Sequence, residues 1–167
     1  MKRLFSLILA VCLCLGTGLS LAEGTVQAEG IAGPYQWLNY ELTVDAVKVA
    51  PGGELFSGPM RASRFIKQDN RIVTQIKETM VEIRLLGGEG GVAYADLEQE
   101  KIEQFVLKDA SGEVIPLYCW SWWGVGYSDE KGFFTEESQE GFSLMYFLPD
   151  GVNAEDLVLS VEAGSAE

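Results

Sequence analysis

The stretch FVLKDASGEVIPLYCWSWWG, residues Phe105 to Gly124, joins two apolar runs through a compact polar turn. In the turn, Asp109 to Gly112, the aspartate can accept hydrogen bonds from nearby backbone amides and the glycine can adopt a positive φ. Phe105 and Leu107 share one face of the first run. The second run, Val114 to Trp123, is apolar at nearly every position, which is typical of a strand covered on both faces. The stretch therefore predicts a hairpin at the centre of a β protein.

Alternating apolar and polar residues predict further strands on both sides of this hairpin. Residues 38–44 alternate in this way, and Val47 and Val49 continue in the opposite phase, so we expect a bulge or a change of sheet near Ala46. Short alternating or apolar runs predict strands over residues 92–94, 142–148 and 157–161.

Residues 71–86 carry two competing patterns. Apolar residues from Ile72 to Ile83 include a set at helical spacing, whereas Val81, Ile83 and Leu85 alternate with charged residues as in a strand. The many β-branched side chains favour a strand, in two pieces of different phase. A helix over the first half stays open.

The N-terminus has the organisation of a signal peptide. A charged start precedes an apolar stretch from residue 4 to about residue 15, and small residues lead to Ala22. We therefore expect cleavage near Ala22 and a secreted or extracytoplasmic protein. The alternatives are an uncleaved membrane anchor, which two glycines would interrupt, and a lipoprotein modified at Cys12 or Cys14, which lack the small preceding residue of a lipobox.

Cleavage leaves ten basic and twenty-five acidic side chains, a net charge of −15. Such a chain repels nucleic acid and anionic headgroups, so we expect no nucleic-acid partner, and a membrane association only if the signal segment is retained. Cys119 is then the sole cysteine, which excludes an intrachain disulfide. Its apolar neighbours predict a buried, unreactive thiol.

About seven short strands, separated by Gly and Pro, predict an all-β fold: an antiparallel immunoglobulin-like β-sandwich, with a small β-barrel as the alternative. We expect a signal peptide over residues 1–22 and a flexible leader over 23–34. A single β-sandwich domain over 35–163 and a disordered tail over 164–167 complete the expected organisation.

A resemblance supports this fold. The order of a long strand near the mature start, a hairpin around LKDASGE and a terminal hairpin FSLMYFLPDGVNAEDLVLSV resembles the secreted immunoglobulin-like domains of unknown function in Gram-positive bacterial envelope proteins. It covers residues 38–161 in outline, and only the two hairpins in residues. The resemblance implies the sandwich and an envelope location, and it transfers no catalytic residue.

The sequence lacks the residues that most catalytic chemistry requires. It contains no histidine, which excludes Ser/His/Asp and Cys/His catalysis and histidine-based zinc sites. Asp96, Glu98 and Glu100 alternate, but a solvated acidic edge strand is favoured over a calcium site. We therefore predict no catalytic activity, no metal site and no cofactor. A glycan hydrolase based on two carboxylates is the remaining enzyme alternative.

Aromatic residues provide the candidate binding site. Tyr118, Trp120 and Trp122 would share one face of the second run, with Trp123 on the other face. We predict Trp120 as core, and Trp122, Trp123 and Tyr127 as ligand-binding residues.

These observations predict an exported, non-catalytic binding or interaction module of the cell envelope, with another protein as the preferred partner. The alternative partner is a polysaccharide that stacks on the aromatic platform. The sequence leaves the oligomeric state open.

Overall fold

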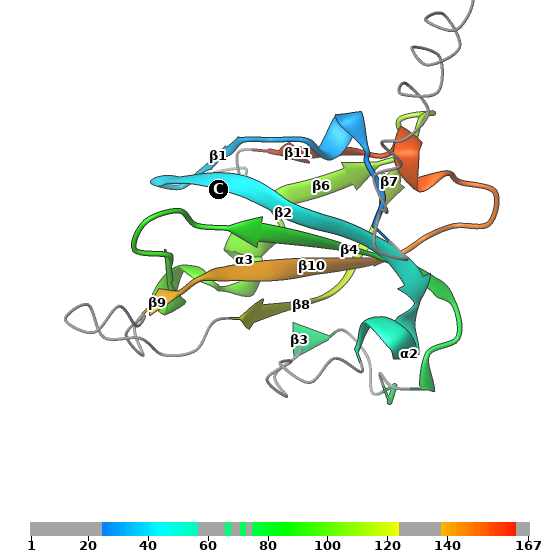
Figure 1. Ribbon diagram of the computed structural model, residues 1–167, viewed down its shortest axis with the longest axis horizontal. Coiled ribbons are helices and arrows are strands. Elements are labelled where there is room, and N and C mark those ends of the chain that lie inside the picture. The colour runs from blue at the N-terminus through cyan, green and yellow to red at the C-terminus, as the bar shows by residue number, and fades with distance from the viewer. Residues whose placement is uncertain (1–24, 57–65, 68–70, 73–74, 124–137, 163–167) are drawn as a thin grey trace, which may run out of the picture.

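The computed structural model describes residues 25–56, 66–67, 71–72, 75–123 and 138–162 (Figure 1). These residues form eleven strands, all paired antiparallel, and a few short helical turns. The all-β fold is therefore confirmed. The structure has more strands than the seven expected because five of them contain only two or three residues.

The strands lie in three sheets. The large sheet has the order β1 (Tyr35–Trp37), β2 (Tyr40–Pro51), β4 (Thr79–Leu86), β10 (Gly141–Phe147), β8 (Leu117–Trp123) and β3 (Ile66–Lys67). The small sheet has the order β11 (Val158–Val161), β6 (Phe105–Lys108) and β7 (Val114–Ile115). A third pair joins β5 (Val92–Ala93) to β9 (Ser138–Gln139). The helical turns are η1 (Glu29–Ile31), α2 (Gly52–Leu55), η3 (Tyr94–Asp96), α3 (Gln99–Ile102) and η5 (Ala154–Asp156).

The polar turn of the central hairpin forms as its residue types predict. The Oδ1 atom of Asp109 accepts hydrogen bonds from the backbone amides of Ser111 and Glu113, at 2.8 and 3.0 Å. Gly112 has a φ of +86°, which a side chain would disfavour. β6 and β7 pair across this turn. The hairpin is confirmed, although it ends at Ile115.

The second apolar run divides at Pro116, between the two sheets. β7 stays beside β6 in the small sheet, whereas β8 enters the large sheet and pairs with β10. Proline has no N–H to donate to a ladder, so a change of sheet at this residue leaves no amide without its strand partner. The chain therefore crosses from one sheet to the other within a single residue.

Both sheets contribute to one core. Phe105 of the small sheet lies 5.4 Å from Trp37 and 5.6 Å from Phe142, between ring centroids, and Trp37 and Phe142 belong to the large sheet. Val81, Ile83 and Leu85 of β4 face the same cluster. The alternate residue Met80 faces a smaller cluster on the other side of the large sheet, with the following members: Leu55, Phe56, Ile76, Tyr118, Cys119 and Met145. Cys119 is 1% exposed, so the prediction that its thiol is buried is confirmed.

The predicted bulge in the first long strand is confirmed. Val44 pairs with Leu85 and Ala46 pairs with Arg84, so Asp45 is the extra residue of β2. Its carboxylate lies 3.3 Å from the guanidinium of Arg84. The bulge changes which face the following residues present, as the phase change in the sequence indicated.

Two expected elements differ in the structure. Of residues 71–86, only β4 is a strand among the described positions, since the described residues before Thr79 form no ladder. The expected terminal hairpin does not form, because β10 pairs with β4 and β8 whereas β11 pairs with β6 in the small sheet. The intervening connection, residues 148–157, is too long for a tight hairpin turn and carries the chain between sheets.

The end of the predicted leader belongs to the packed body. The amide of Val26 donates to the carbonyl of Val47 at 2.9 Å, and Ile31 in η1 has no exposed surface. A Cβ on Gly30 would come within 2.3 Å of the carbonyl oxygen of Leu157. The expectation of a flexible leader to residue 34 is therefore wrong for residues 26–31, because apolar side chains spaced too sparsely to show a pattern fill the core. Residues 1–22 and 164–167 lie outside the described part of the chain.

The turn between β1 and β2 holds a leucine in an unfavourable conformation. Trp37 pairs with Tyr40, so Leu38 and Asn39 form a two-residue turn, whereas the sequence pattern placed Leu38 in a strand. Leu38 has a φ of +53°, a region where a side chain collides with the backbone and where such turns favour glycine. Leu38 is 48% exposed, so only about half of its surface is buried to offset this strain.

Helices of the described residues are short. None of them is long and apolar enough to cross a membrane.

We expect Gly30→Ala to lower the free energy of unfolding by about 1–3 kcal/mol, because the added methyl group must displace the backbone at Leu157. Urea unfolding of the two proteins measures this difference. Ala32→Ser, at a nearby exposed position, is the control. Equal stability of Gly30→Ala and the parent would show that residues 26–31 do not pack as described.

We expect Leu38→Gly to be more stable than Leu38→Ala by about 1 kcal/mol, because both remove the exposed side chain and only glycine relieves the positive φ. Thermal and urea unfolding of the matched pair measure the difference. A less stable glycine variant would contradict the turn conformation.

Candidate binding site

Three aromatic rings lead from the core to the surface beside the end of β8. We call Trp120, Trp122 and Tyr94 the aromatic cluster. The rings of Trp120 and Trp122 lie 5.5 Å apart, and Tyr94 meets Trp122 edge to face at 5.1 Å. Trp120 is 3% exposed, Trp122 is half-buried and Tyr94 is 44% exposed. The cluster therefore presents one accessible ring on a buried support.

Trp120 is fixed by a hydrogen bond as well as by packing. Its Nε1 donates to Oε1 of Gln99 at 2.9 Å, and Nε2 of Gln99 donates to Glu103 at 2.7 Å. The buried indole N–H thus has a partner, as a buried Trp usually requires. Trp120 is core, as the sequence predicted.

The segment that carries Tyr94 and Gln99 is held against the large sheet. We call residues 92–104 the cap segment. The hydroxyl of Tyr40 donates to Oδ2 of Asp96 at 2.7 Å and accepts from the amide of Ala93 at 3.1 Å. Nε1 of Trp37 donates to the carbonyl of Lys101 at 3.1 Å. Two aromatic side chains that flank the β1–β2 turn therefore fix the backbone on either side of Tyr94.

Charges within the cap segment complete this network. Nζ of Lys101 lies 3.0 Å from Asp96 and 3.4 Å from Glu98. The hydroxyl of Tyr40 and then the ammonium of Lys101 stabilise the carboxylate and lower the pKa of Asp96. Burial, followed by the hydrogen bond to Asp96, raises the pKa of Tyr40. The bond to Asp96 also raises the pKa of Lys101.

The acidic run does not form the expected edge strand. Residues 94–96 and 99–102 form η3 and α3, and the helical turns bring Asp96 and Glu98 to the same lysine. The strand interpretation failed because the alternation of acids coincided with a helical turn that buries Leu97 and Ile102. Across the described ranges, no group of three or more acidic or cysteine side chains is arranged to hold a metal ion.

Of the three predicted binding residues, the structure describes the side chain of Trp122 alone. Trp122 belongs to the aromatic cluster and contacts both of its other rings. Trp123 pairs with Gly141 at the end of β8, but its side chain lies outside the description, as does Tyr127. Tyr94 was not predicted, although an aromatic residue between a glycine loop and an acidic run was a visible signal.

Tyr118 does not share a face with Trp120 and Trp122, contrary to the prediction. Leu117 pairs with Tyr146 and Cys119 pairs with Met145, so Tyr118 is an extra residue in β8. Tyr118 instead packs beside Phe147, at 4.5 Å between centroids, in the smaller cluster. A bulge shifts the alternation by one residue, which strict period-two reasoning misses.

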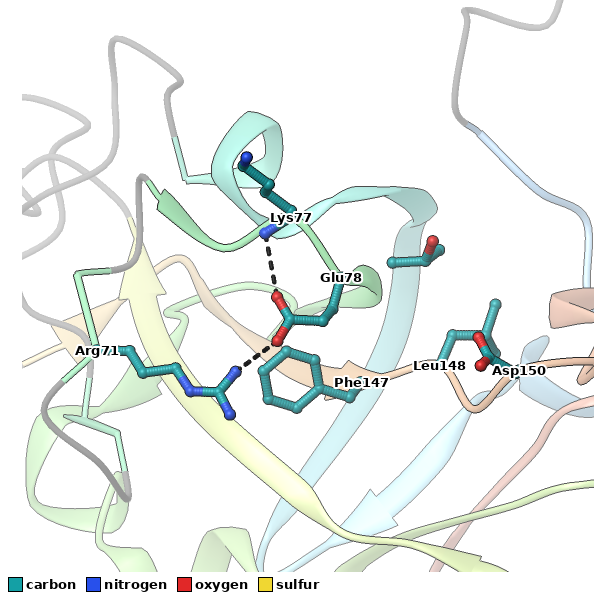
Figure 2. A pocket seen from close by; sticks show the side chains of 7 residues that line it. Arg71, Lys77, Glu78, Phe147, Leu148 and Asp150 are labelled. Carbon is teal, nitrogen blue, oxygen red and sulfur yellow. Dashed lines mark hydrogen bonds and ion pairs between the residues drawn. The ribbon is translucent and has the colours of Figure 1, made fainter.

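A shallow hollow of about 460 Å³ lies at the other end of β10 (Figure 2). Its residues are Arg71, Lys77, Glu78, Thr79, Phe147, Leu148 and Asp150. The guanidinium of Arg71 lies 2.9 Å from Glu78 and 5.3 Å from the centre of the Phe147 ring. Figure 2 shows the side chain of Lys77 directed away from both. Because this exposed ion pair already satisfies its own charges, the hollow is a weaker candidate than the aromatic cluster.

A buried carboxylate lies on the large sheet, on the face opposite the core. Glu82 is 1% exposed and accepts a hydrogen bond from the hydroxyl of Ser143 at 2.9 Å. Ser121 is also buried and follows the same face of the sheet. Because Glu82 and Ser143 are almost fully buried, we assign them a structural role.

Comparison with known proteins leaves the aromatic cluster as the main guide to function. No protein-family model matches the chain, and neither the curated proteins nor the solved structures include a significant match.

We expect Asp96 to make stability depend on pH in the acid range. Its folded pKa is lowered, so its contribution is present above the ordinary aspartate pKa, about 4, and is lost as the pH falls through the folded value. The difference in unfolding free energy between the parent and Asp96→Asn should therefore shrink from pH 5 to pH 3, values chosen to bracket that pKa.

Tyr40→Phe is the matched variant, because it removes the main cause of the lowered pKa and keeps the ring. The pH-dependent difference at Asp96 should be smaller in this background. An unchanged difference would show that Tyr40 does not stabilise the carboxylate.

Proposed function

We propose that this protein is an exported, non-catalytic binding module of the cell envelope, and that its partner is another envelope protein. The observation that carries the proposal is the aromatic cluster, in which exposed Tyr94 rests on Trp122 and buried Trp120. A tyrosine held in one orientation loses little entropy on binding, which is why such residues anchor protein interfaces.

The geometry favours a protein partner over a polysaccharide. A sugar-binding platform needs an open ring face, and Trp122 already contacts the rings of Tyr94 and Trp120. Tyr94 alone offers a smaller face. The alternative remains a carbohydrate-binding module in which Trp122, Trp123 and Tyr127 stack on sugar rings, and the experiment below includes it.

Two features support a non-catalytic role. The chain has no histidine, so the usual general base at neutral pH is missing. A glycosidase needs one carboxylic acid with a raised pKa, and the pKa values of Glu78, Asp96 and Asp109 are lowered by hydrogen bonds that favour the charged form, so these three residues do not suit that role.

Export is supported by the sequence of residues 1–22 and by the resemblance to secreted immunoglobulin-like domains of Gram-positive envelopes. The acidic net charge suits a protein that must stay soluble outside the cell.

We expect Tyr94→Ser to weaken binding to envelope proteins at least tenfold, because it removes the exposed ring without opening the core. The measurement is surface plasmon resonance of the immobilised protein against fractionated envelope proteins and, separately, purified envelope polysaccharides. Val114→Ser is the control, since Val114 is 54% exposed on the small sheet, away from the aromatic cluster.

Binding to proteins that is lost in Tyr94→Ser and kept in Val114→Ser supports the proposal. Binding to polysaccharides alone would replace it with the carbohydrate alternative. Equal binding by both variants would exclude the aromatic cluster as the contact surface.

A further inference from the structure

Leu38 is the residue whose position the fold does not explain. It adopts a positive φ that costs stability, and its side chain is 48% exposed. Glycine would form the same two-residue turn without strain. When burial offsets only part of the strain at a residue, a contact with another molecule is a further physical reason for its presence.

Leu38 lies at the same end of the molecule as the aromatic cluster. Tyr40, which closes the turn of Leu38, bonds through its hydroxyl to the backbone of Ala93, the residue before Tyr94. Trp37, on the other side of the turn, bonds to Lys101 of the cap segment. In Figure 1 the β1–β2 turn and the strand β9, which pairs with β5, lie at this end. Leu38 and Tyr94 are thus two exposed apolar side chains on one rigid support.

The charges around these side chains are acidic. The cap segment contains four acidic residues and one lysine, and that lysine is engaged by Asp96 and Glu98. Glu100 and Glu103 are exposed on the same segment, and Glu41 is exposed next to the β1–β2 turn. A partner with Lys or Arg beside apolar residues complements this surface, and a cation can also bind the face of the Tyr94 ring.

We propose that Leu38 and Tyr94 form one docking surface for a cationic segment of a protein partner, and that Leu38 is kept at its strained position as a contact residue. This inference rests on the proposed function and names the chemistry of the partner. The surface pairs two apolar contacts with a rim of carboxylates, so binding weakens as the salt concentration rises.

Selection of random displayed peptides on the purified protein tests the inference. We expect the enriched peptides to combine Lys or Arg with aliphatic or aromatic residues, and to bind Leu38→Gly at least tenfold more weakly than the parent. Leu38→Gly is suited to this test because glycine adopts this positive φ without strain, and its measured free energy of unfolding shows whether lost binding reflects a lost fold. Leu38→Met, which keeps an apolar side chain of similar size, should retain most of the affinity.

Enriched peptides that are acidic, or that bind Leu38→Gly as tightly as the parent, would overturn the inference. Self-association that disappears in Leu38→Gly, seen by sedimentation, would also overturn it by assigning the surface to a second copy of the chain. If Tyr94→Ser loses envelope-protein binding while Leu38→Gly keeps it, the proposed function stands and this inference fails. If neither variant affects that binding, both fail.

Discussion

The contact of Phe105 with Trp37 and Phe142 is the interaction on which the rest of the structure depends. It joins the small sheet to the large sheet, and it buries three large rings that no single sheet could cover. Trp37 also bonds to the carbonyl of Lys101, so the residue that closes the core positions the cap segment. Cys119 is the single cysteine among the described residues, so no disulfide joins them and this packing supplies their rigidity.

Local chemistry predicted the features that depend on neighbouring residues. The aspartate and glycine of the central turn, and the phase change in the first long strand, each became the expected turn or bulge. Features that depend on distant partners were not predictable in this way. The change of sheet at Pro116 and the separation of β10 from β11 follow from which strand edges are available in three dimensions, and apolar alternation is the same for either pairing.

The candidate site also combines features that neighbouring residues determine with features that depend on distant partners. Trp122 could be predicted from the density of aromatic residues in the sequence, because large aromatic side chains contribute much of the buried area of a core or of an interface. The glycine loop and the acidic run beside Tyr94 were a visible signal, but they could not show that its ring is exposed, since that depends on the hydrogen bonds of Tyr40 and on the pairing of β5 with β9. The prediction of an acidic edge strand was wrong for a related reason. The acidic residues do alternate in the sequence, but helical turns form there and bury Leu97 and Ile102.

The exposed apolar side chains of this protein differ in whether their local backbone structure explains them. Val158, Lys108 and Val114 lie in one row across the outer face of the small sheet, where β-branched residues stabilise strands simply by fitting the pleated surface. Strand propensity therefore accounts for both valines. No propensity accounts for leucine at a positive φ in a two-residue turn, where the backbone disfavours it and about half of the residue is exposed to solvent. A marginally stable domain has only about 5–15 kcal/mol to lose, so a strain of about 1–2 kcal/mol at Leu38 is a physical argument for the contact role proposed above.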